Sequence, residues 1–475
     1  MGELWILINL LCSFVVIFLQ RKEPRSAWAW LLVLNALPGV GFLLYLLAGT
    51  DMNKRRMFRI KEIEDQVNEA VRRQECDIRR YRTEAGSSGE HRFADQVYYN
   101  LETTGAMLFD DNETEIFTDG NEKFESLIRD IRGAQHFIFL QYYIIRSDLL
   151  FDRIREELIQ KQQEGVEVRV LFDGMGCRSV SRRYWKEMEK CGIRTAVFFP
   201  ALLGRLHIRV NYRNHRKIAV IDGKIGYVGG FNIGKEYLGL DPDFGYWRDT
   251  HLRIRGKAVA GLLIRYMQDW DYAARENLFA DPGYLSLTEE AGGDVKMQII
   301  SSGPDSARQV IRDNYLMLIN KARRRIFIQT PYFIPDEALM AALLIAVSSG
   351  VEVNVMIPCK PDHPFVYWAT WSYVGELVNA GANCYTYDNG FIHAKGVLVD
   401  GEACCYGTAN FDNRSFALNF EVNAVIYDGR IAKQMEQIFL EDVKKSCRIT
   451  KEQYAARSLW IRFKEQCCRL LSPLL

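Results

Sequence analysis

The sequence predicts an α/β protein with two tandem, duplicated domains, each a mixed β-sheet flanked by helices, after an N-terminal membrane helical hairpin. Two observations support this. The chain repeats three segments in the same order, and each copy alternates amphipathic helical patterns with short β-branched runs. In front of the copies lie two uncharged apolar runs. At 475 residues the chain is long enough for two or three domains with cores of their own.

The first element is a membrane region, residues 1–50, with apolar segments at 4–20 and 26–48 that "RKEPR" separates. A helix needs about 20 apolar residues to cross the hydrocarbon core, so the first segment is slightly short and the second is long enough. A signal peptide is disfavoured, because no basic residue precedes the first run and a second apolar run follows at once. We expect two spans or one re-entrant hairpin, with the main body on the cytoplasmic side, where basic residues gather.

Two amphipathic segments flank the body of the chain. Residues 51–110 are expected to form an amphipathic helix, to about residue 82, and then a linker that contains "GSSG". The tail, residues 451–475, carries apolar residues at helical spacing with basic residues elsewhere. They are Leu459, Phe463, Cys467, Leu470 and Leu474. This tail is either an interfacial helix on anionic lipid or a helix docked on the protein's own body.

The body is an internal duplication, with repeat 1 at 111–285 and repeat 2 at 290–450. Three pairs of segments match in order. They are "HFIFLQYYI" and "RIFIQTPYFI", "GVEVRVLFD" and "GVEVNVMIP", and "HRKIAVIDG" and "HAKGVLVDG". A repeat of this length is a duplicated domain and not a solenoid unit. Two equivalent halves can bring their repeated motifs face to face, so that two half-sites form one whole site.

Each repeat carries the same polar set: a histidine, a lysine two residues later, an aspartate in an Asp-Gly turn and an asparagine further on. On a strand the histidine and the lysine point to the same face. The small residues of "GGFN" and "GTAN" let the backbone approach a ligand closely. The residues are His215, Lys217, Asp222 and Asn232 in segment 210–236, and His393, Lys395, Asp400 and Asn410 in segment 388–415.

These residue types suit phosphoryl chemistry. Lysine and asparagine offer positive charge and N–H donors to a phosphate. Two histidines suit a double displacement, in which one attacks phosphorus and the other protonates the leaving oxygen. Such a site needs no metal or other cofactor. A single H-x-K pair is most often a solvated strand edge, but here the longer pattern recurs at matching places of a duplication.

Composition narrows the function classes. The net charge is +1, which disfavours a dedicated nucleic-acid binder. The 11 cysteines include no C-x-x-C pair, so neither a zinc framework nor a secreted disulfide scaffold is expected. We expect no nucleic-acid partner, and cysteines that stay reduced.

The motif segments resemble the paired H-x-K-x4-D motifs of the phospholipase D superfamily, and most closely those of its bacterial cardiolipin synthase branch. The resemblance rests on "NYRNHRKIAVIDG", "GGFNIGKEYLG", "YWRDTHLRIRG", "HAKGVLVD" and "GTANFDNRSFALNFEVN". The N-terminal apolar pair and the tail also resemble that branch, so nearly the whole chain is covered. The resemblance implies two phospholipase D-like domains in a multi-pass protein of the bacterial cell membrane, with a cytoplasmic catalytic domain.

The resemblance also implies roles for the motif residues. His215 is expected to be the nucleophile that forms a phosphohistidine, and His393 the general acid and then the base. Two later acidic residues are expected to fix the histidine tautomers in a crossed arrangement, Glu421 with His215 and Asp249 with His393. The phosphate oxygens would be held by Lys217, Lys395, Asn232 and Asn410. The motif aspartates, Asp222 and Asp400, count with the catalytic set but are expected to stabilise turns and lysines.

The implied reaction joins two phosphatidylglycerols into cardiolipin with release of glycerol, at a membrane bilayer. Three alternatives use the same motifs: a hydrolase with water as the acceptor, a phosphatidyltransferase to another alcohol such as serine or ethanolamine, and a nuclease. The nuclease is disfavoured by the membrane region and the neutral charge. A non-catalytic membrane scaffold would predict a broken motif in one repeat, and both motifs are intact.

Overall fold

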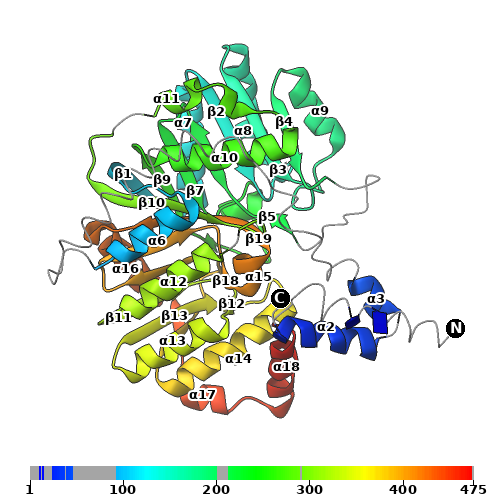
Figure 1. The fold of residues 1–475 in the computed structure, drawn as a ribbon, viewed down its shortest axis with the longest axis vertical. Helices are drawn as coiled ribbons and strands as arrows, with labels where there is room; N and C mark the ends of the chain where they lie inside the picture. The colour runs from blue at the N-terminus through cyan, green and yellow to red at the C-terminus, as the bar shows by residue number, and fades with distance from the viewer. Residues whose placement is uncertain are drawn as a thin grey trace.

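The structure, a computed structural model, describes residues 10–11, 13–14, 24–37, 39–45, 92–200, 212–288, 291–306 and 308–472. The amphipathic helix expected near 51–82 and most of segment 4–20 lie outside the described residues. Near the N-terminus the structure describes the helices α2 (Pro24–Ala36) and α3 (Val40–Leu44), drawn beside the lower half of the body (Figure 1). No helix within the described ranges is both long and apolar enough to cross a membrane.

The body consists of two halves that share one 16-stranded mixed sheet, with the first half above the second in Figure 1. From the junction outward the first half has the order β1-β9-β7-β6-β2-β3-β4, and the second has the matching order β10-β19-β17-β16-β11-β13-β14, with β20 at its edge. Strands β1 and β10 join the halves in antiparallel pairing. The predicted duplication and mixed α/β class are therefore confirmed by the strand order.

Most of the sheet strands follow apolar runs of the sequence, whereas β1 is largely polar. In the first half they are β1 (Phe109–Phe117), β2 (Phe137–Tyr142), β3 (Glu167–Asp173), β4 (Arg194–Phe198), β6 (Ile218–Ile221), β7 (Ile225–Gly229) and β9 (His251–Arg255). In the second half they are β10 (Val295–Ser302), β11 (Arg325–Gln329), β13 (Glu352–Pro358), β14 (Asn383–Tyr387), β16 (Gly396–Val399), β17 (Ala403–Gly407), β19 (Asn419–Ile426) and β20 (Ser446–Ile449).

Helices cover both faces of the sheet. One face is covered by α7 (Gly120–Gly133) and α8 (Leu149–Gln163) in the first half, and by α12 (Val310–Lys321), α13 (Glu337–Ser348) and α14 (Pro364–Ala380) in the second. The other face is covered by α10 (Val259–Ala274) and α16 (Gly429–Val443). Aspartate N-caps begin several of them; the Asp119 carboxylate, for example, accepts the first amides of α7.

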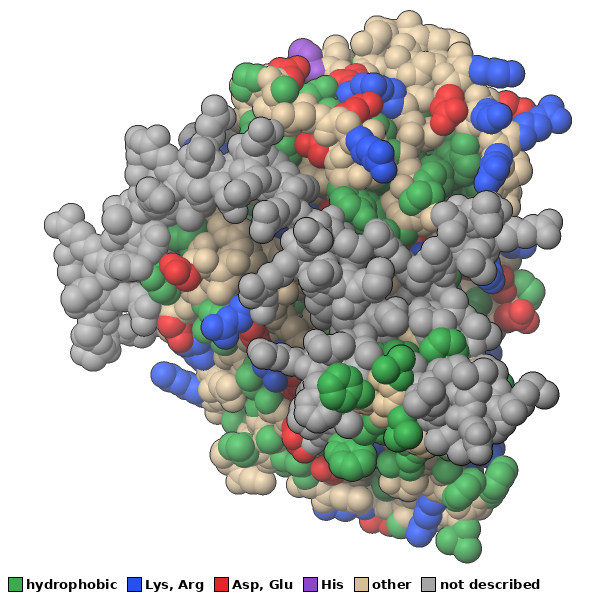
Figure 2. Space-filling model, turned by 45° about the vertical axis from the view of Figure 1, so that its right-hand side comes forward, with side chains coloured by type: hydrophobic (Ala, Val, Ile, Leu, Met, Phe, Trp, Pro, Cys, Tyr) green, Lys and Arg blue, Asp and Glu red, His purple; other side chains and the backbone are tan. Residues whose placement is uncertain are grey.

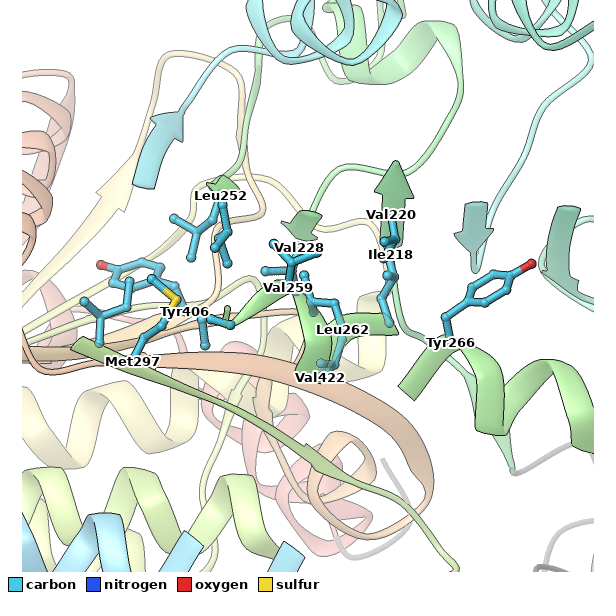
Figure 3. Close-up of a cluster of buried hydrophobic side chains, with 14 of the residues drawn as sticks. Ile218, Val220, Val228, Leu252, Val259, Leu262, Tyr266, Met297, Tyr406 and Val422 are labelled. Carbon is cyan, nitrogen blue, oxygen red and sulfur yellow. The ribbon is translucent and has the colours of Figure 1, made fainter. Parts of the chain in front are cut away.

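Alternating side chains of the strands feed separate cores. Ile218 and Val220 of β6 face the core under α10, whereas Ala219 and Ile221 face the core under α7 and α8. The core under α10 runs without interruption into the second half, where Met297, Tyr406 and Val422 continue it (Figure 3). This shared core holds the two halves in one fixed arrangement, which the site between them requires.

Short elements complete the fold, and several position the site. They are α6 (Ala94–Thr104), α9 (Arg182–Lys190), β5 (Arg213–Asn214), the 3-10 helices η4 (Lys235–Leu238) and η5 (Leu278–Ala280), β8 (Trp247–Arg248), α11 (Gly283–Ser286), β12 (Phe333–Ile334), β15 (Phe391–Ile392), β18 (Phe411–Asp412), α15 (Asn413–Ala417), α17 (Lys451–Ala455) and α18 (Leu459–Leu470). Helix α18 packs against α14, so the tail is docked on the body.

Candidate active site

The two motif histidines lie where the halves meet, and each is held by the opposite half. Strand β5 pairs in parallel with β19, and the His215 N–H donates to the Phe420 carbonyl oxygen at 3.0 Å. In the same way β15 pairs with β8, and the His393 N–H donates to the Arg248 carbonyl oxygen at 2.7 Å. Each histidine therefore sits in a backbone frame that neither half supplies alone.

The expectation that the motif pairs lie within a strand needs correction. His215 and Lys217 belong to a three-residue link between β5 and β6, and His393 and Lys395 to the same link between β15 and β16. The physical reason is the change of partner at this point. The chain leaves a pairing with the opposite half and enters the sheet of its own half.

A buried carboxylate contacts each histidine across the interface. His215 Nδ1 lies 2.9 Å from Glu421 Oε1, and His393 Nδ1 lies 2.7 Å from Asp249 Oδ2. Both carboxylates are fully buried. An ionised carboxylate only accepts hydrogen bonds, so it favours the tautomer with the proton on Nδ1 and leaves the lone pair of Nε2 available. These contacts join the residues in the crossed arrangement that the resemblance implies, and their role in fixing the tautomers stays a prediction.

The two lysines place positive charge at the same interface. Lys217 Nζ donates to the His215 carbonyl oxygen at 2.6 Å, and Lys395 Nζ lies 3.8 Å from Asp249 Oδ2. Burial lowers the pKa of Lys217 to about 7, with Glu421 opposing this shift and nearby Lys395 adding to it. Burial also lowers the pKa of Lys395 to about 8. A bound anion would favour the charged form of both lysines.

The pKa values of both imidazoles are lowered, which favours their neutral forms. Burial, followed by Lys395, lowers the pKa of His393 to about 4, against the opposing effect of Asp249. Burial also lowers the pKa of His215, which Glu421 opposes. Lys395 acts on His215 and Lys217 acts on His393, so the charges of both motifs act within one site.

Aromatic rings flank both histidines. The ring of Tyr143 meets that of His215 at 4.9 Å between centroids, and the ring of Trp247 meets that of His393 at 5.1 Å. Each histidine is 8% exposed. The imidazoles are thus covered on their sides by apolar surface, which limits the approach of bulk water.

The motif asparagines differ in how far the protein satisfies them. Asn232 Oδ1 accepts the Ile144 N–H at 3.0 Å, and its Nδ2 donates to the Tyr237 hydroxyl at 3.1 Å. Asn410 is buried, and its Oδ1 has no hydrogen-bond partner among the described residues. The phosphate-holding role of the two amides stays a prediction.

The motif aspartates lie at the far ends of β6 and β16 from the histidines. Asp222 accepts the backbone N–H groups of residues 135–137 at 2.7 to 2.8 Å, and Asp400 accepts those of residues 323–325 at 2.8 Å. Both have positive φ, 52° and 55°. Their carboxylates tie the turns to the starts of β2 and β11, so we assign them to the fold and not to the chemistry.

The two half-sites support their carboxylates differently, which sequence reasoning did not foresee. The Thr408 hydroxyl donates to Glu421 Oε2 at 2.5 Å. The equivalent position is Gly230, where an added Cβ would lie 1.8 Å from Asp249 Oδ1. The difference between "GTAN" and "GGFN" is the sequence signal for this asymmetry. In one half a threonine hydroxyl binds the carboxylate, and in the other half a glycine leaves room for it.

A second feature that the sequence did not reveal is a pair of buried arginine–aspartate contacts. Arg216 contacts Asp269 at 2.5 Å, and Arg248 contacts Asp442 at 2.7 Å. The strand registers make Arg216 equivalent to Ala394 and Arg248 equivalent to Phe420. Each aspartate thus receives one arginine, but from a different position in each half. In the sequence this difference appears as "HRK" in the first motif and "HAK" in the second.

Over the part of the chain that the structure describes, no group of three or more histidine, cysteine, aspartate or glutamate side chains is arranged to hold a metal ion. The two motifs supply two imidazoles, two lysine amino groups and two amides. This set fits attack on a phosphodiester anion, followed by transfer to a second acceptor.

Comparison with known families agrees with this geometry. The family "Cardiolipin synthase, PLD-like domain" matches the chain twice, over residues 127–269 and 315–443, which are more than half of its length. The chain belongs to this cardiolipin synthase family of the phospholipase D superfamily. The family "Phospholipase D-nuclease N-terminal" matches residues 7–49.

Full-length relatives support this membership of the cardiolipin synthase family. The major cardiolipin synthase ClsA of Bacillus subtilis is 46% identical over 481 residues, which cover 100% of this chain and 98% of that protein. A cardiolipin synthase of Listeria welshimeri is 48% identical, over 99% of this chain and 98% of that protein. The chain is accordingly a member of a family of phosphatidyltransferases that act on phospholipids.

A solved structure supports the fold. The phosphatidylserine synthase of Haemophilus influenzae has a TM-score of 0.59 to this cardiolipin synthase family member at 16% identity, over 76% of this chain and 95% of that one. At this identity the similarity concerns the architecture only. It agrees with the two-half arrangement described above.

Proposed function

We propose that this cardiolipin synthase family member transfers a phosphatidyl group from one phosphatidylglycerol to the hydroxyl of a second, releasing glycerol and forming cardiolipin. One observation carries the proposal. Two neutral imidazoles, each with Nδ1 held by a buried carboxylate of the opposite half, share one site with two buried lysines. A symmetric pair of this kind suits a reaction whose two steps are chemically the reverse of each other.

In the first step the phosphodiester anion lies between Lys217 and Lys395. The lone pair of His215 Nε2 attacks phosphorus, and the bond from phosphorus to the glycerol oxygen breaks. His393 Nε2 gives its proton to that oxygen. The bound anion raises the low pKa of His393, because it neutralises the surrounding lysine charge, and so lets this histidine enter the step protonated.

In the second step glycerol has left and a second phosphatidylglycerol occupies its place. Neutral His393 removes the proton of the incoming hydroxyl, whose oxygen attacks phosphorus, and the P–N bond returns its electron pair to His215 Nε2. The phosphohistidine carries positive charge on its ring while Nδ1 stays protonated. Glu421, 2.9 Å from Nδ1, stabilises that charge.

The low exposure of the two histidines supports a lipid alcohol, and not water, as the acceptor. Tyr143 and Trp247 lie against the two imidazoles, and each histidine is nearly buried. A phosphohistidine formed there would have little contact with bulk water. This favours transfer over hydrolysis, and the relatives named as cardiolipin synthases favour phosphatidylglycerol over other alcohols.

The proposal includes the membrane and the domain limits. Residues 1–50 would anchor the chain in the bacterial cell membrane as a multi-pass region, with the catalytic body on the cytoplasmic side. The match of residues 7–49 to the N-terminal family and the uncharged segments support this. Repeat 1 would span 111–285 and repeat 2 would span 290–450, which enclose the two matched ranges.

The test uses purified full-length protein in detergent with headgroup-labelled phosphatidylglycerol as the only lipid. Equal amounts of glycerol and cardiolipin are expected. His215→Ala and His393→Ala should each lose about 10³-fold or more of this activity, since each removes a reacting group. His136→Ala is the matched control, because this exposed histidine lies outside the site. Glycerol together with phosphatidic acid would mean that water is the acceptor, and the hydrolase would replace our proposal.

A further inference from the structure

One stripe of the C-terminal helix α18 is covered by the protein, and a second, apolar stripe is exposed. The covered stripe includes Glu465 and Cys468 and is continued by Ser472, whose hydroxyl lies 2.9 Å from the Tyr373 hydroxyl of α14. Arg469 adds an ion pair with Glu376 of α14 at 2.7 Å. These contacts fix the rotation of α18 about its axis.

The uncovered stripe points away from the body. Leu459, Trp460, Phe463 and Leu470 are 82%, 63%, 58% and 78% exposed. Trp460 and Phe463 stack on each other at 5.5 Å. Single exposed apolar residues are ordinary, but a contiguous row of large ones marks an interaction site. Figure 2 shows hydrophobic side chains gathering over the lower half of the molecule, where α2, α3 and α18 lie.

The row extends onto the start of α14. Lys464 Nζ lies 4.8 Å from the ring of Trp368 and 5.6 Å from that of Trp460, so these two rings border one cation. One helical turn before Trp368 lies Phe365, which is 62% exposed. We call the exposed residues Phe365, Leu459, Trp460, Phe463 and Leu470 the α18 face.

The charges beside the α18 face select its partner. Arg457 and Arg469 are paired with Glu465 and Glu376. Arg462 and Lys464 have no carboxylate within ion-pair distance among the described residues. Two cations outside any such ion pair, beside exposed tryptophan, phenylalanine and leucine, are the composition of a helix that lies in the interface of an anionic bilayer.

The α18 face lies near the active site, and helix α14 connects the two. Helix α14 begins directly after Asp362 and His363. The Asp362 carboxylate accepts the Tyr332 hydroxyl, and the following residue, Phe333, pairs with Phe411, which is the neighbour of Asn410 in the chain. The helix that carries part of the α18 face therefore starts at the edge of the active site. A bilayer that covers this face would therefore lie near the active site.

We infer that the α18 face docks on the surface of an anionic phospholipid bilayer, in addition to any attachment through residues 1–50, and so holds the active site against its lipid. The use of phosphatidylglycerol as the probe lipid rests on the proposed function. Trp460 and Phe463 would enter the headgroup and acyl boundary, while Arg462 and Lys464 would contact headgroup phosphates.

A crosslinking experiment tests the location directly. The full-length protein, with the photoreactive residue p-benzoylphenylalanine in place of Phe463, is reconstituted in phosphatidylglycerol vesicles and irradiated. A lipid adduct at this position is expected. The matched control places the same residue at Leu440, which is 40% exposed on α16, on the opposite face of the second half's sheet, and should give none. A crosslink to a second copy or to the chain's own N-terminal region, or no adduct, would overturn the inference.

A kinetic experiment tests the consequence. Trp460→Gln/Phe463→Gln should lower kcat/KM at least about tenfold for phosphatidylglycerol in vesicles, because both side chains lose apolar burial in the bilayer. With short-chain phosphatidylglycerol dissolved as monomers the variant should match the wild type, which also shows that it is folded. Leu440→Gln should leave both rates unchanged. Equal losses on both substrates, or no loss on vesicles, would contradict the docking role. A wild type that makes no cardiolipin from either substrate would refute the proposed function instead, while the crosslink would still report on docking.

Discussion

Replacing Glu421 by glutamine removes a charge and one acceptor from a site where every neighbour is a donor. His215 Nδ1 lies 2.9 and 3.0 Å from the two oxygens, the Thr408 hydroxyl donates to Oε2 at 2.5 Å, and Asn419 Nδ2 donates to Oε1 at 3.3 Å. The NH2 group of a glutamine must therefore face a donor. If it faces Nδ1, it favours the wrong tautomer and places the ring proton on Nε2, the atom that must attack.

The size of the effect follows from these contacts. A hydrogen bond to a charged group contributes about 1–2 kcal/mol more than a neutral one, and a buried donor without an acceptor costs about 1–3 kcal/mol. Together they amount to about 2–5 kcal/mol, which corresponds to a rate loss of roughly 30-fold to 5,000-fold. The Thr408 hydroxyl donates its single proton to Oε2 and accepts the Val422 N–H at 2.9 Å, so an NH2 group turned toward it would take away the acceptor of that proton.

The assay is the initial rate of glycerol release by Glu421→Gln, with trapping of the acid-labile phosphoenzyme and a thermal unfolding curve. The matched control is Glu436→Gln, the same chemical change at a mostly buried glutamate of α16 that pairs with Arg325 at 2.7 Å outside the site. It should keep its rate. A folded Glu421→Gln protein with less than a threefold loss would falsify the tautomer argument.

Three further predictions follow from the site and its frame. Gly230→Ala should lose about tenfold or more of the activity, because its Cβ would overlap the Asp249 carboxylate, whereas Gly133→Ala, with nothing within 4 Å, should not; rates and melting temperatures of both variants decide this. Asp400→Asn should unfold about 1–3 kcal/mol more easily in urea near pH 7, since the carboxylate accepts three backbone N–H groups. Burial acts to raise the pKa of Asp400, but those hydrogen bonds outweigh it and lower the pKa. The carboxylate therefore stabilises the fold fully above its ordinary pKa of 3.8, and this stabilisation is lost as the pH falls through the lower value of the folded state. A stability difference between wild type and variant that does not shrink in acid would contradict this. The kcat/KM for monomeric phosphatidylglycerol should fall as the pH rises through about 7, because Lys217 loses its proton there in the free enzyme, while kcat should fall only at higher pH; a flat kcat/KM profile between pH 6 and 9 would speak against a phosphate held by this ammonium group.

The sequence by itself determined the duplication, the α/β class and the residues of the two motifs. A duplication is visible in the sequence because the same segments recur in the same order. Apolar runs predict the strands, and H-x-K-x4-D recurs at matching places. The acidic residues Asp249 and Glu421 lie 34 and 28 residues after His215 and His393, at matching places of the repeats, and the resemblance implied their crossed arrangement.

Only the tertiary structure decided how the two halves differ and what remains exposed. The support of Glu421 by Thr408, the room that Gly230 leaves for Asp249 and the exchange of Arg216 for Arg248 are contacts between segments distant along the chain. The sequence pattern of the tail fits docking on the body and docking on lipid equally, whereas the structure shows α18 covered on one stripe and open on the other. The physical reason is that helical and strand periodicity records which side chains share a face, while distance and packing decide which partner, if any, covers that face.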